Sequence, residues 1–86
     1  MQCSVEISMY PLDKNYIEPI ISFIKKIRSY PNLSVETNGM STQIFGQYDD
    51  VMNVLQVEIK NCFELQEKVV FNLKVINSSL QEKPKF

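Results

Sequence analysis

Residues 37–52 of this chain read Thr37-Asn38-Gly39-Met40-Ser41-Thr42-Gln43-Ile44-Phe45-Gly46-Gln47-Tyr48-Asp49-Asp50-Val51-Met52. The pair Asn38-Gly39 lies between two runs of β-forming residues, and such a pair is the strongest short-range signal of a β-hairpin. A two-residue type I′ turn needs positive φ at both central positions, which Asn and Gly tolerate. We therefore predict a hairpin with Asn38 and Gly39 at its tip.

A turn of this length also predicts the register, because a tight turn fixes which residues face each other. The expected pairs are Thr37 with Met40, Glu36 with Ser41, Val35 with Thr42, Ser34 with Gln43 and Leu33 with Ile44. One face of the hairpin is then mainly apolar: Leu33, Val35, Thr37, Met40, Thr42 and Ile44. We expect this face, including Met40, to contact the core. The opposite face is polar apart from one aromatic residue, Phe45, and we expect the functional residues to lie on that face.

The segment before the hairpin shows two different periodicities. Residues 2–10 alternate, with Cys3, Val5, Ile7 and Met9 on one face, which predicts a half-buried strand ended by Pro11. Residues 15–30 follow a helical period instead, through Ile17, Ile20, Ile21, Ile24 and Ile27. We expect Asp13 or Asn15 to cap this helix, Pro19 to lie near its first turn, and Pro31-Asn32 to end it.

The segment after the hairpin predicts one helix and one strand. The helix is expected over residues 48–63, with Val51, Met52, Leu55, Ile59, Cys62 and Phe63 as its buried stripe. Asp49 and Asp50 suit its N-terminus. The strand is expected over residues 67–77, with Val69, Phe71, Leu73 and Val75 facing the core.

The order strand-helix-strand-strand-helix-strand predicts an α+β fold, the ferredoxin-like split βαβ sandwich. Right-handed crossovers place both helices on one face of a four-stranded antiparallel sheet. Residues 1–77 form the domain, and the polar tail 78–86 is expected to be mobile unless a partner holds it. The other sheet face stays open and carries Ser4, Glu6, Ser8, Tyr10, Ser34, Glu36, Ser41, Gln43, Phe45, Asn72 and Lys74.

Bulk properties limit the class of function. The 86 residues are 44% hydrophobic and 22% charged, which is typical of a single soluble globular domain. A net charge of −1 gives no electrostatic basis for binding nucleic acid or an anionic membrane. No apolar run reaches membrane-spanning length, and no signal peptide is evident. We expect a cytoplasmic protein, and a chain this short favours self-association.

The residue inventory excludes several chemistries. The chain has no histidine, so Ser-His and Cys-His nucleophilic pairs are impossible. Cys3 and Cys62 are expected to be reduced thiols, and no metal site or cofactor is expected. Glu6 and Glu36 share the open face, where the simplest expectation is that both are solvated. Two other roles remain open for this pair, namely attraction of a cation and acid–base chemistry in an enzyme.

Two motifs carry a resemblance to a known family. The strand end Ile7-Ser8-Met9-Tyr10-Pro11-Leu12 and the segment from Asn38 to Met52 resemble the thiamine-binding domain family, as does Tyr16-Ile17-Glu18-Pro19-Ile20-Ile21. The likeness extends over residues 2–77. It implies a ferredoxin-like binding protein rather than an enzyme, with thiamine or its hydroxymethylpyrimidine part as the ligand. It also implies assembly into a homodimer or homotetramer.

Carried onto this chain, the resemblance places a pocket near the open sheet face and the hairpin, at or near a subunit interface. The candidate ligand-binding residues are Ser8, Tyr10, Glu36, Asn38, Ser41, Thr42 and Phe45. Asn38, Ser41 and Thr42 would hydrogen-bond the aminopyrimidine, Tyr10 or Phe45 would stack on a ring, and Glu36 or Glu6 would offset the positive thiazolium. The alternative is a structural or regulatory oligomerisation domain without a small-molecule ligand.

Overall fold

The structure is a computed structural model that describes residues 1–86. Its elements are β1 (Gln2–Pro11), α1 (Ile17–Arg28), β2 (Ser34–Thr37), β3 (Thr42–Gln47), α2 (Tyr48–Leu65) and β4 (Val69–Ile76). They follow the predicted order, with boundaries that differ by a few residues. Pro19 lies in the first turn of α1, and Lys25, Lys26 and Arg28 lie near its C-terminal end.

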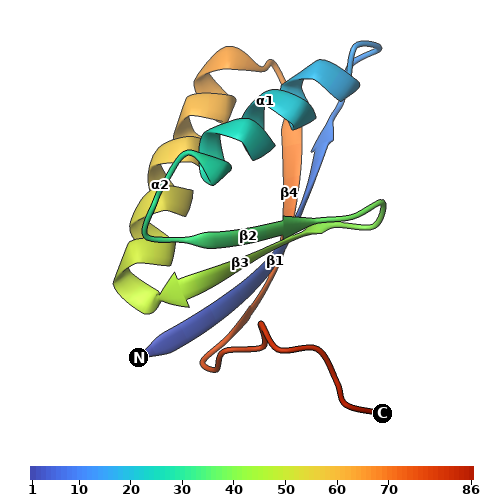
Figure 1. Ribbon diagram of the computed structural model, residues 1–86. Helices are drawn as coiled ribbons and strands as arrows, with labels where there is room; N and C mark the ends of the chain where they lie inside the picture. The colour runs from blue at the N-terminus through green and yellow to red at the C-terminus, as the bar shows by residue number, and fades with distance from the viewer.

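One sheet and one layer of helices make up the molecule. The strands are arranged in the order β2-β3-β1-β4, and all neighbours are antiparallel. Both helices cover the same face of the sheet (Figure 1). This is the ferredoxin-like α+β sandwich, so the fold predicted from the sequence is confirmed.

Strand β1 is the centre of the sheet, because it pairs with β3 on one side and with β4 on the other. Ile7 faces Thr42 on β3 and Leu73 on β4. Two backbone hydrogen bonds at the ends of these ladders show which residues of β1 bond to which neighbouring strand. The Tyr48 N–H donates to the Met1 C=O, and the Leu12 N–H donates to the Lys68 C=O. Since bonded pairs alternate along antiparallel strands, odd-numbered residues of β1 bond toward β3 and even-numbered ones toward β4.

The core lies between the sheet and the helices. Its buried side chains come from both layers: Cys3, Val5, Ile7, Met9, Phe23, Ile27, Ile44, Val51, Val54 and Leu55. The alternation predicted for β1 is confirmed by this set. The stripe predicted for α1 is only partly right: Ile27 is buried, but Ile17 and Ile21 are 53% and 46% exposed, and Phe23 is the other buried side chain of the helix. On α2, Val54 and Glu58 are buried, whereas Phe63, expected in the stripe, is 55% exposed.

The hairpin forms, but its turn and register differ from the prediction. Thr37 faces Thr42, not Met40, so the loop has four residues, 38–41. No residue of the chain has positive φ. The Asn38 Oδ1 instead accepts the N–H groups of Met40 (2.8 Å) and Ser41 (3.1 Å), which stabilises the wider loop without a type I′ turn.

The wider loop has two consequences. Because the register shifts by two residues, each strand residue keeps its predicted face. Met40, however, leaves the strand and becomes 88% exposed, so the expectation that it contacts the core is wrong.

The capping residue predicted for α1 is also wrong. The N-cap is Tyr16, and its side chain makes no capping hydrogen bond. The Asp13 carboxylate accepts the Asn15 N–H within the preceding loop (3.0 Å), so it stabilises the loop rather than the helix terminus.

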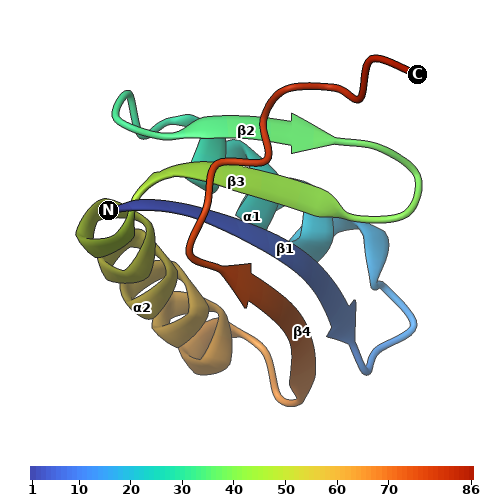
Figure 2. The same ribbon diagram turned by 90° about the horizontal axis from the view of Figure 1, so that it is seen from below.

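The start of the C-terminal tail is held against the open sheet face, contrary to the expectation of a mobile tail. Ser4 Oγ donates to the Ser78 C=O (2.7 Å) and accepts the Leu80 N–H (2.9 Å). Gln81 Nε2 donates to Ser34 Oγ (2.6 Å). Figure 2 shows this segment crossing β3 and β2 on the side opposite the helices. We call residues 78–81 the strap.

The strap changes what the open face presents. Phe45 faces Ser4 and Ser34 in the sheet register, and only 7% of it is exposed. An aromatic residue expected to be free on the open face is therefore enclosed.

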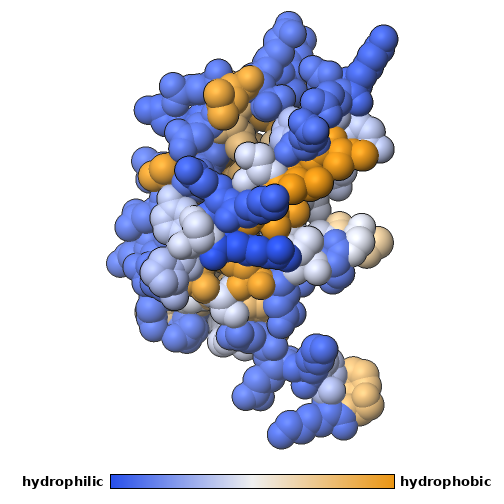
Figure 3. Space-filling model, turned by 45° about the horizontal axis from the view of Figure 1, so that its top comes forward, coloured by the Kyte–Doolittle hydropathy of each residue, from blue (hydrophilic) through white to orange (hydrophobic).

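The face seen in Figure 3 is mainly hydrophilic, with hydrophobic side chains gathered in a few patches. The C-terminal end of the chain projects away from the body (Figure 1). Neither helix has the length and apolar character needed to cross a membrane.

We expect Ser4→Ala to loosen the strap, because it removes both hydrogen bonds that Ser4 makes to residues 78 and 80. The loss should reduce the free energy of unfolding by about 1–2 kcal/mol. The direct measurement is amide hydrogen exchange, in which the Leu80 N–H should exchange faster in the variant while the amides of α1 are unaffected. An unchanged rate at Leu80 would mean that the strap is not held by Ser4.

Candidate functional site

A cavity of about 220 Å³ lies where the end of β1, helix α1 and the hairpin loop meet. Its lining is Ile7, Ser8, Met9, Tyr10, Ile20, Phe23, Ile24, Thr37, Asn38, Gly39, Met40, Ser41 and Thr42. Seven of these 13 residues are hydrophobic. An apolar hollow with a few converging polar groups is the usual form of a small-molecule site.

The cavity exists because β1 is longer than β3. Pairing between the two strands stops at Ile7 and Thr42, whereas β1 continues to Pro11 beside β4. By the alternation described above, the N–H and C=O of Met9 point toward the β3 side, beyond the last paired residue. The Met40 N–H, which would be opposite them in a longer ladder, is bonded to Asn38. The main chain of Met9 therefore presents one donor and one acceptor to the cavity.

The hairpin loop supplies polar side chains on the other side. The carbonyl oxygen of Asn38 is used within the loop, which leaves its NH₂ group for another partner. Ser41 Oγ donates to Glu6 Oε2 (2.8 Å) and accepts from Gln43 Nε2 (2.8 Å). The Glu6 carboxylate also lies 3.6 Å from the Lys74 ammonium. Ser41 thus connects the cavity to a carboxylate on the open face.

Two threonine hydroxyls, one buried and one on an exposed residue, line the cavity. Thr42 is 5% exposed, and its Oγ1 lies 3.1 Å from Thr37 Oγ1. Because one hydroxyl donates to the other, the pair still has one O–H and several lone pairs available. The apolar wall around it includes Phe23, whose ring is tilted against Phe71 at a centroid distance of 5.1 Å.

Five of the seven residues predicted from the sequence line this cavity: Ser8, Tyr10, Asn38, Ser41 and Thr42. The other two do not. Glu36 is exposed on the open face opposite Gln43, and Phe45 lies under the strap. The Met9 backbone and the apolar wall from α1 were not anticipated. The 3.6-residue period of α1 marks that wall as buried but does not say that a cavity adjoins it.

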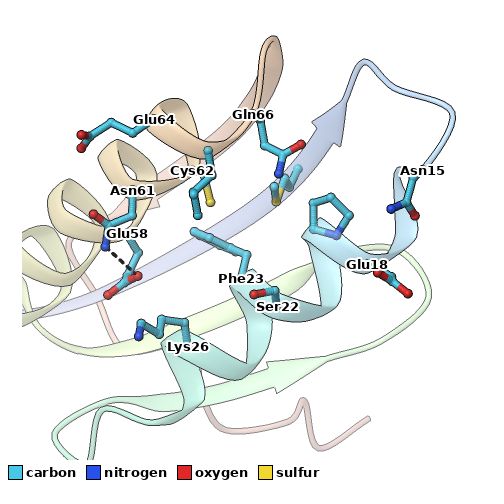
Figure 4. Close-up of a pocket in the computed structure, with 13 residues that line it drawn as sticks. Asn15, Glu18, Ser22, Phe23, Lys26, Glu58, Asn61, Cys62, Glu64 and Gln66 are labelled. Atoms are coloured by element: carbon cyan, nitrogen blue, oxygen red, sulfur yellow. Dashed lines mark hydrogen bonds between the residues drawn. The ribbon is translucent and has the colours of Figure 1, made fainter.

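A second, wider hollow of about 720 Å³ lies between α1 and α2 (Figure 4). Its lining includes Glu58, a carboxylate that is only 4% exposed. Tyr30 Oη donates to Glu58 Oε2 (2.6 Å), and Asn61 Nδ2 lies 3.5 Å from Oε1. Burial, together with the Glu58 charge, raises the pKa of the nearby Cys62 thiol, which disfavours its reactive thiolate form.

The two hollows differ in character. Only four of the 13 residues lining the hollow between the helices are hydrophobic, and its buried carboxylate already has a short bond to Tyr30. This arrangement ties α2 to the loop that follows α1. The cavity at the hairpin is more enclosed by apolar groups and is therefore the better candidate for a ligand.

Comparison with known proteins supports the fold described above. A family model described as "Thiamine-binding protein" matches residues 5–83. The chain belongs to the thiamine-binding protein family. A comparison with curated proteins gives no match.

Solved structures similar to this thiamine-binding family member share its fold at low sequence identity. A Thermotoga maritima protein, described as a candidate thiamine biosynthesis/salvage protein, is 19% identical with a TM-score of 0.81, over 91% of this chain and 85% of the other. A Streptococcus pneumoniae protein is 18% identical with a TM-score of 0.84, over 93% and 90%. A domain of unknown function from Bacillus cereus is 16% identical with a TM-score of 0.70, over 99% and 84%.

The Tyr30–Glu58 contact predicts a pH dependence of stability. The hydrogen bond to Glu58, together with burial and the Glu58 charge, raises the pKa of the Tyr30 phenol. The unfolded chain then loses this proton at a lower pH than the folded chain. The stabilisation is fully present below about pH 10, the ordinary tyrosine value, and is lost as the pH rises through the raised folded pKa.

We expect Tyr30→Phe to reduce the pH dependence of the free energy of unfolding above about pH 10. It should also lower the free energy of unfolding at neutral pH by about 1–3 kcal/mol, because Glu58 loses its main hydrogen-bond donor. Urea unfolding at a series of pH values measures both effects. Tyr16→Phe, which removes an exposed phenol, is the control. Equal slopes for the Tyr30 variant and the wild type above pH 10 would contradict the assignment.

Proposed function

We propose that this protein binds thiamine, or its hydroxymethylpyrimidine part, in the cavity at the hairpin, and that it does so without transforming the ligand. The observation that carries the proposal is the convergence on one apolar cavity of the Met9 main chain, Asn38, Ser41 and Thr42. Membership of the thiamine-binding family supports the choice of ligand.

The size of the cavity favours the pyrimidine ring as the enclosed part. Sites for drug-sized ligands usually measure about 300–1,000 Å³, whereas this cavity measures about 220 Å³. A single substituted ring suits that volume, and the thiazolium of thiamine would remain nearer the exposed rim. Tyr10 and Met40, which are 50% and 88% exposed, lie at that rim.

The polar groups suit an aminopyrimidine. Its 4-amino group donates and its adjacent ring nitrogen accepts, so a neighbouring acceptor and donor are needed. The Met9 C=O and N–H form such a pair on one strand edge. Asn38 NH₂ and the Thr37–Thr42 hydroxyls can serve the remaining ring nitrogen and the hydroxymethyl group.

Glu6 is the carboxylate that we assign to the positive charge of the thiazolium. It reaches the cavity through Ser41, whereas Glu36 lies one strand further away on the exposed face. Because Lys74 offsets part of the Glu6 charge, we expect a modest contribution from this carboxylate.

Binding without turnover follows from the groups available. The cavity offers hydroxyls, an amide and main-chain groups, and its one neighbouring carboxylate is already paired with Ser41 and Lys74. None of these hydroxyls has a histidine to activate it, since the chain contains none. Mass spectrometry of thiamine and its phosphates after incubation with the protein would reveal any product and so contradict this part of the proposal.

Thermal unfolding with a panel of ligands tests the proposed function. Thiamine and hydroxymethylpyrimidine should each raise the melting temperature saturably. A ligand at ~100 times its dissociation constant adds about 2.7 kcal/mol, and each kcal/mol corresponds to about 4–8 °C in a small domain. Oxythiamine, in which oxygen replaces the 4-amino group, should bind about 5- to 150-fold more weakly, since it places an acceptor against the Met9 C=O and costs about 1–3 kcal/mol.

Thr42→Val tests the contribution of the Thr37–Thr42 hydroxyl pair, because it removes one hydroxyl and changes the side-chain volume little. It should weaken thiamine and hydroxymethylpyrimidine alike. Equal affinity for thiamine and oxythiamine would contradict the role of Met9. If no ligand of the panel raises the melting temperature, the binding proposal is contradicted, and an oligomerisation domain becomes the better description.

The roles of Glu6 and Glu36 can be distinguished by comparing a cationic with a neutral ligand. Glu6→Gln should weaken binding of cationic thiamine about two- to fivefold and leave the neutral hydroxymethylpyrimidine unchanged, as expected for a partly screened charge worth under 1 kcal/mol. Glu36→Gln should affect neither ligand. Isothermal titration calorimetry measures both, and the reverse pattern would place the thiazolium beside Glu36.

A further inference from the structure

The cavity at the hairpin is lined by uncharged groups, and the charged group hydrogen-bonded to its lining is negative. None of its 13 lining residues is a lysine or an arginine. Ser41, which lines the cavity, donates a 2.8 Å hydrogen bond to Glu6 Oε2. One hydroxyl thus separates the cavity from a carboxylate. The electrostatic potential there favours a neutral or positive group over an anion.

Lys74 is the cation paired with this carboxylate, and it does not reverse the sign. Its ammonium lies 3.6 Å from Glu6 Oε1, and its side chain is 82% exposed. Lys74 belongs to β4, whereas Ser41 reaches Glu6 from the hairpin on the other side of β1. To meet an anion in the cavity, the ammonium would have to leave Glu6 and cross β1. The carboxylate would then lose its counter-ion.

The loop N–H groups that could hold an anion are already used. Successive main-chain N–H groups of a turn often form an anion-binding concavity. In the hairpin loop, however, the Met40 and Ser41 N–H groups donate to Asn38 Oδ1. The Asn38 N–H donates to the Ser41 C=O. Three of the four N–H groups of residues 38–41 are therefore unavailable to a ligand.

The N-terminus of α1 does not supply an anion site either. Phosphate groups bind well at helix N-termini, where free N–H groups point at the ligand. The cavity meets α1 along its side instead, at Ile20, Phe23 and Ile24, and residues 16–19 are absent from its lining. Within that first turn, Glu18 adds a negative charge and Pro19 has no N–H.

We propose that the cavity selects its ligand by charge: it takes the pyrimidine as the neutral alcohol or joined to a cation, and it rejects the phosphate ester of the same alcohol. This inference rests on the proposed function and adds to it the chemical state in which the ligand is bound. Glu6 is the residue that determines the selection, acting beside Ser41.

The phosphate ester places its charge where the cavity is least able to accept it. In thiamine, the thiazolium is attached to the carbon that carries the hydroxyl of hydroxymethylpyrimidine. A phosphate on that hydroxyl therefore takes the position that we assign to the thiazolium, near Ser41 and Glu6. A phosphate monoester carries about −1.5 to −2 charges at pH 7. The attraction expected for the thiazolium thus becomes a repulsion.

Thiamine phosphates differ from this ester, because their phosphate lies beyond the thiazolium, at the far end of its side chain. The positive ring then stands between the phosphate and Glu6. We expect thiamine phosphate to bind more weakly than thiamine, but by a smaller factor than the one that separates the pyrimidine phosphate from its alcohol.

Isothermal titration calorimetry of the full chain with three forms of the pyrimidine tests the proposal. The phosphate ester should bind about 10- to 100-fold more weakly than the alcohol at low ionic strength, as expected for two negative charges near a partly neutralised carboxylate. The acetate ester of the same alcohol is the control for size, since it adds a neutral group. It should bind nearly as well as the alcohol.

Ionic strength separates repulsion from steric exclusion. The Debye length falls from about 30 Å at 0.01 M salt to about 3 Å at 1 M salt. The affinity ratio of alcohol to phosphate ester should therefore decrease as salt is added. Exclusion by size would leave the ratio unchanged.

Substitution of Glu6 gives effects of opposite sign on two ligands. Glu6→Gln should strengthen binding of the phosphate ester about two- to fivefold, while it weakens cationic thiamine by a similar factor. Glu36→Gln, which removes the exposed carboxylate of β2, is the matched control and should change neither affinity. Loss of affinity for both ligands in Glu6→Gln would mean that Glu6 only supports the loop.

A cation added at the rim should reverse the selection. Met40 lines the cavity and is 88% exposed, so its replacement leaves the core intact. Met40→Arg should raise the affinity of the phosphate ester relative to the alcohol, because a guanidinium binds phosphate through two parallel hydrogen bonds. Met40→Gln is the uncharged control and should leave this ratio as it is in the wild type.

The outcomes distinguish this inference from the proposed function. Equal affinity for the alcohol and its phosphate ester would overturn the selection by charge and leave the proposed function standing. A ratio that does not change with salt, or an acetate ester rejected as strongly as the phosphate, would overturn it too. If neither thiamine nor the alcohol binds, the proposed function is wrong, and this inference fails with it.

Discussion

The pairing of β1 with strands on both sides is the constraint on which the rest of the structure depends. Its six-residue register with β3 and its eight-residue register with β4 have different lengths, so the end of β1 is paired on one side only. That difference creates a gap at Met9, bounded by α1 and the hairpin loop. The cavity is thus a consequence of strand lengths, and its main-chain donor and acceptor come from the strand that also centres the core.

The hairpin adapts to this gap through Asn38. Its side-chain oxygen accepts two loop amides, which stabilises a four-residue loop and brings Ser41 beside Glu6. A tighter turn would have extended the ladder toward Met9 and closed the space. The residue that marks the turn in the sequence therefore also helps to keep this cavity open.

The open sheet face, the β2 edge and the β4 edge differ in what covers them. The strap covers part of the open sheet face through Ser4 and Ser34 and encloses Phe45. The β2 edge is short and polar. The β4 edge is eight residues long and apolar except at Asn72 and Lys74. The buried Glu58 is retained between the helices because Tyr30 and Asn61 supply its hydrogen bonds.

The amino-acid sequence by itself determined the element order and the faces of β1 and β4, because these depend on local periodicity. The motifs that carry the family resemblance pointed to five residues that line the cavity. The tertiary structure alone decided the exposure of Met40, the burial of Phe45 under residues 78–81, the burial of Glu58 and the end of the β1–β3 pairing before Met9. Each of these depends on a neighbour distant in sequence or on a difference between strand lengths. A periodic pattern says which way a side chain points, but only the packed chain determines what lies there.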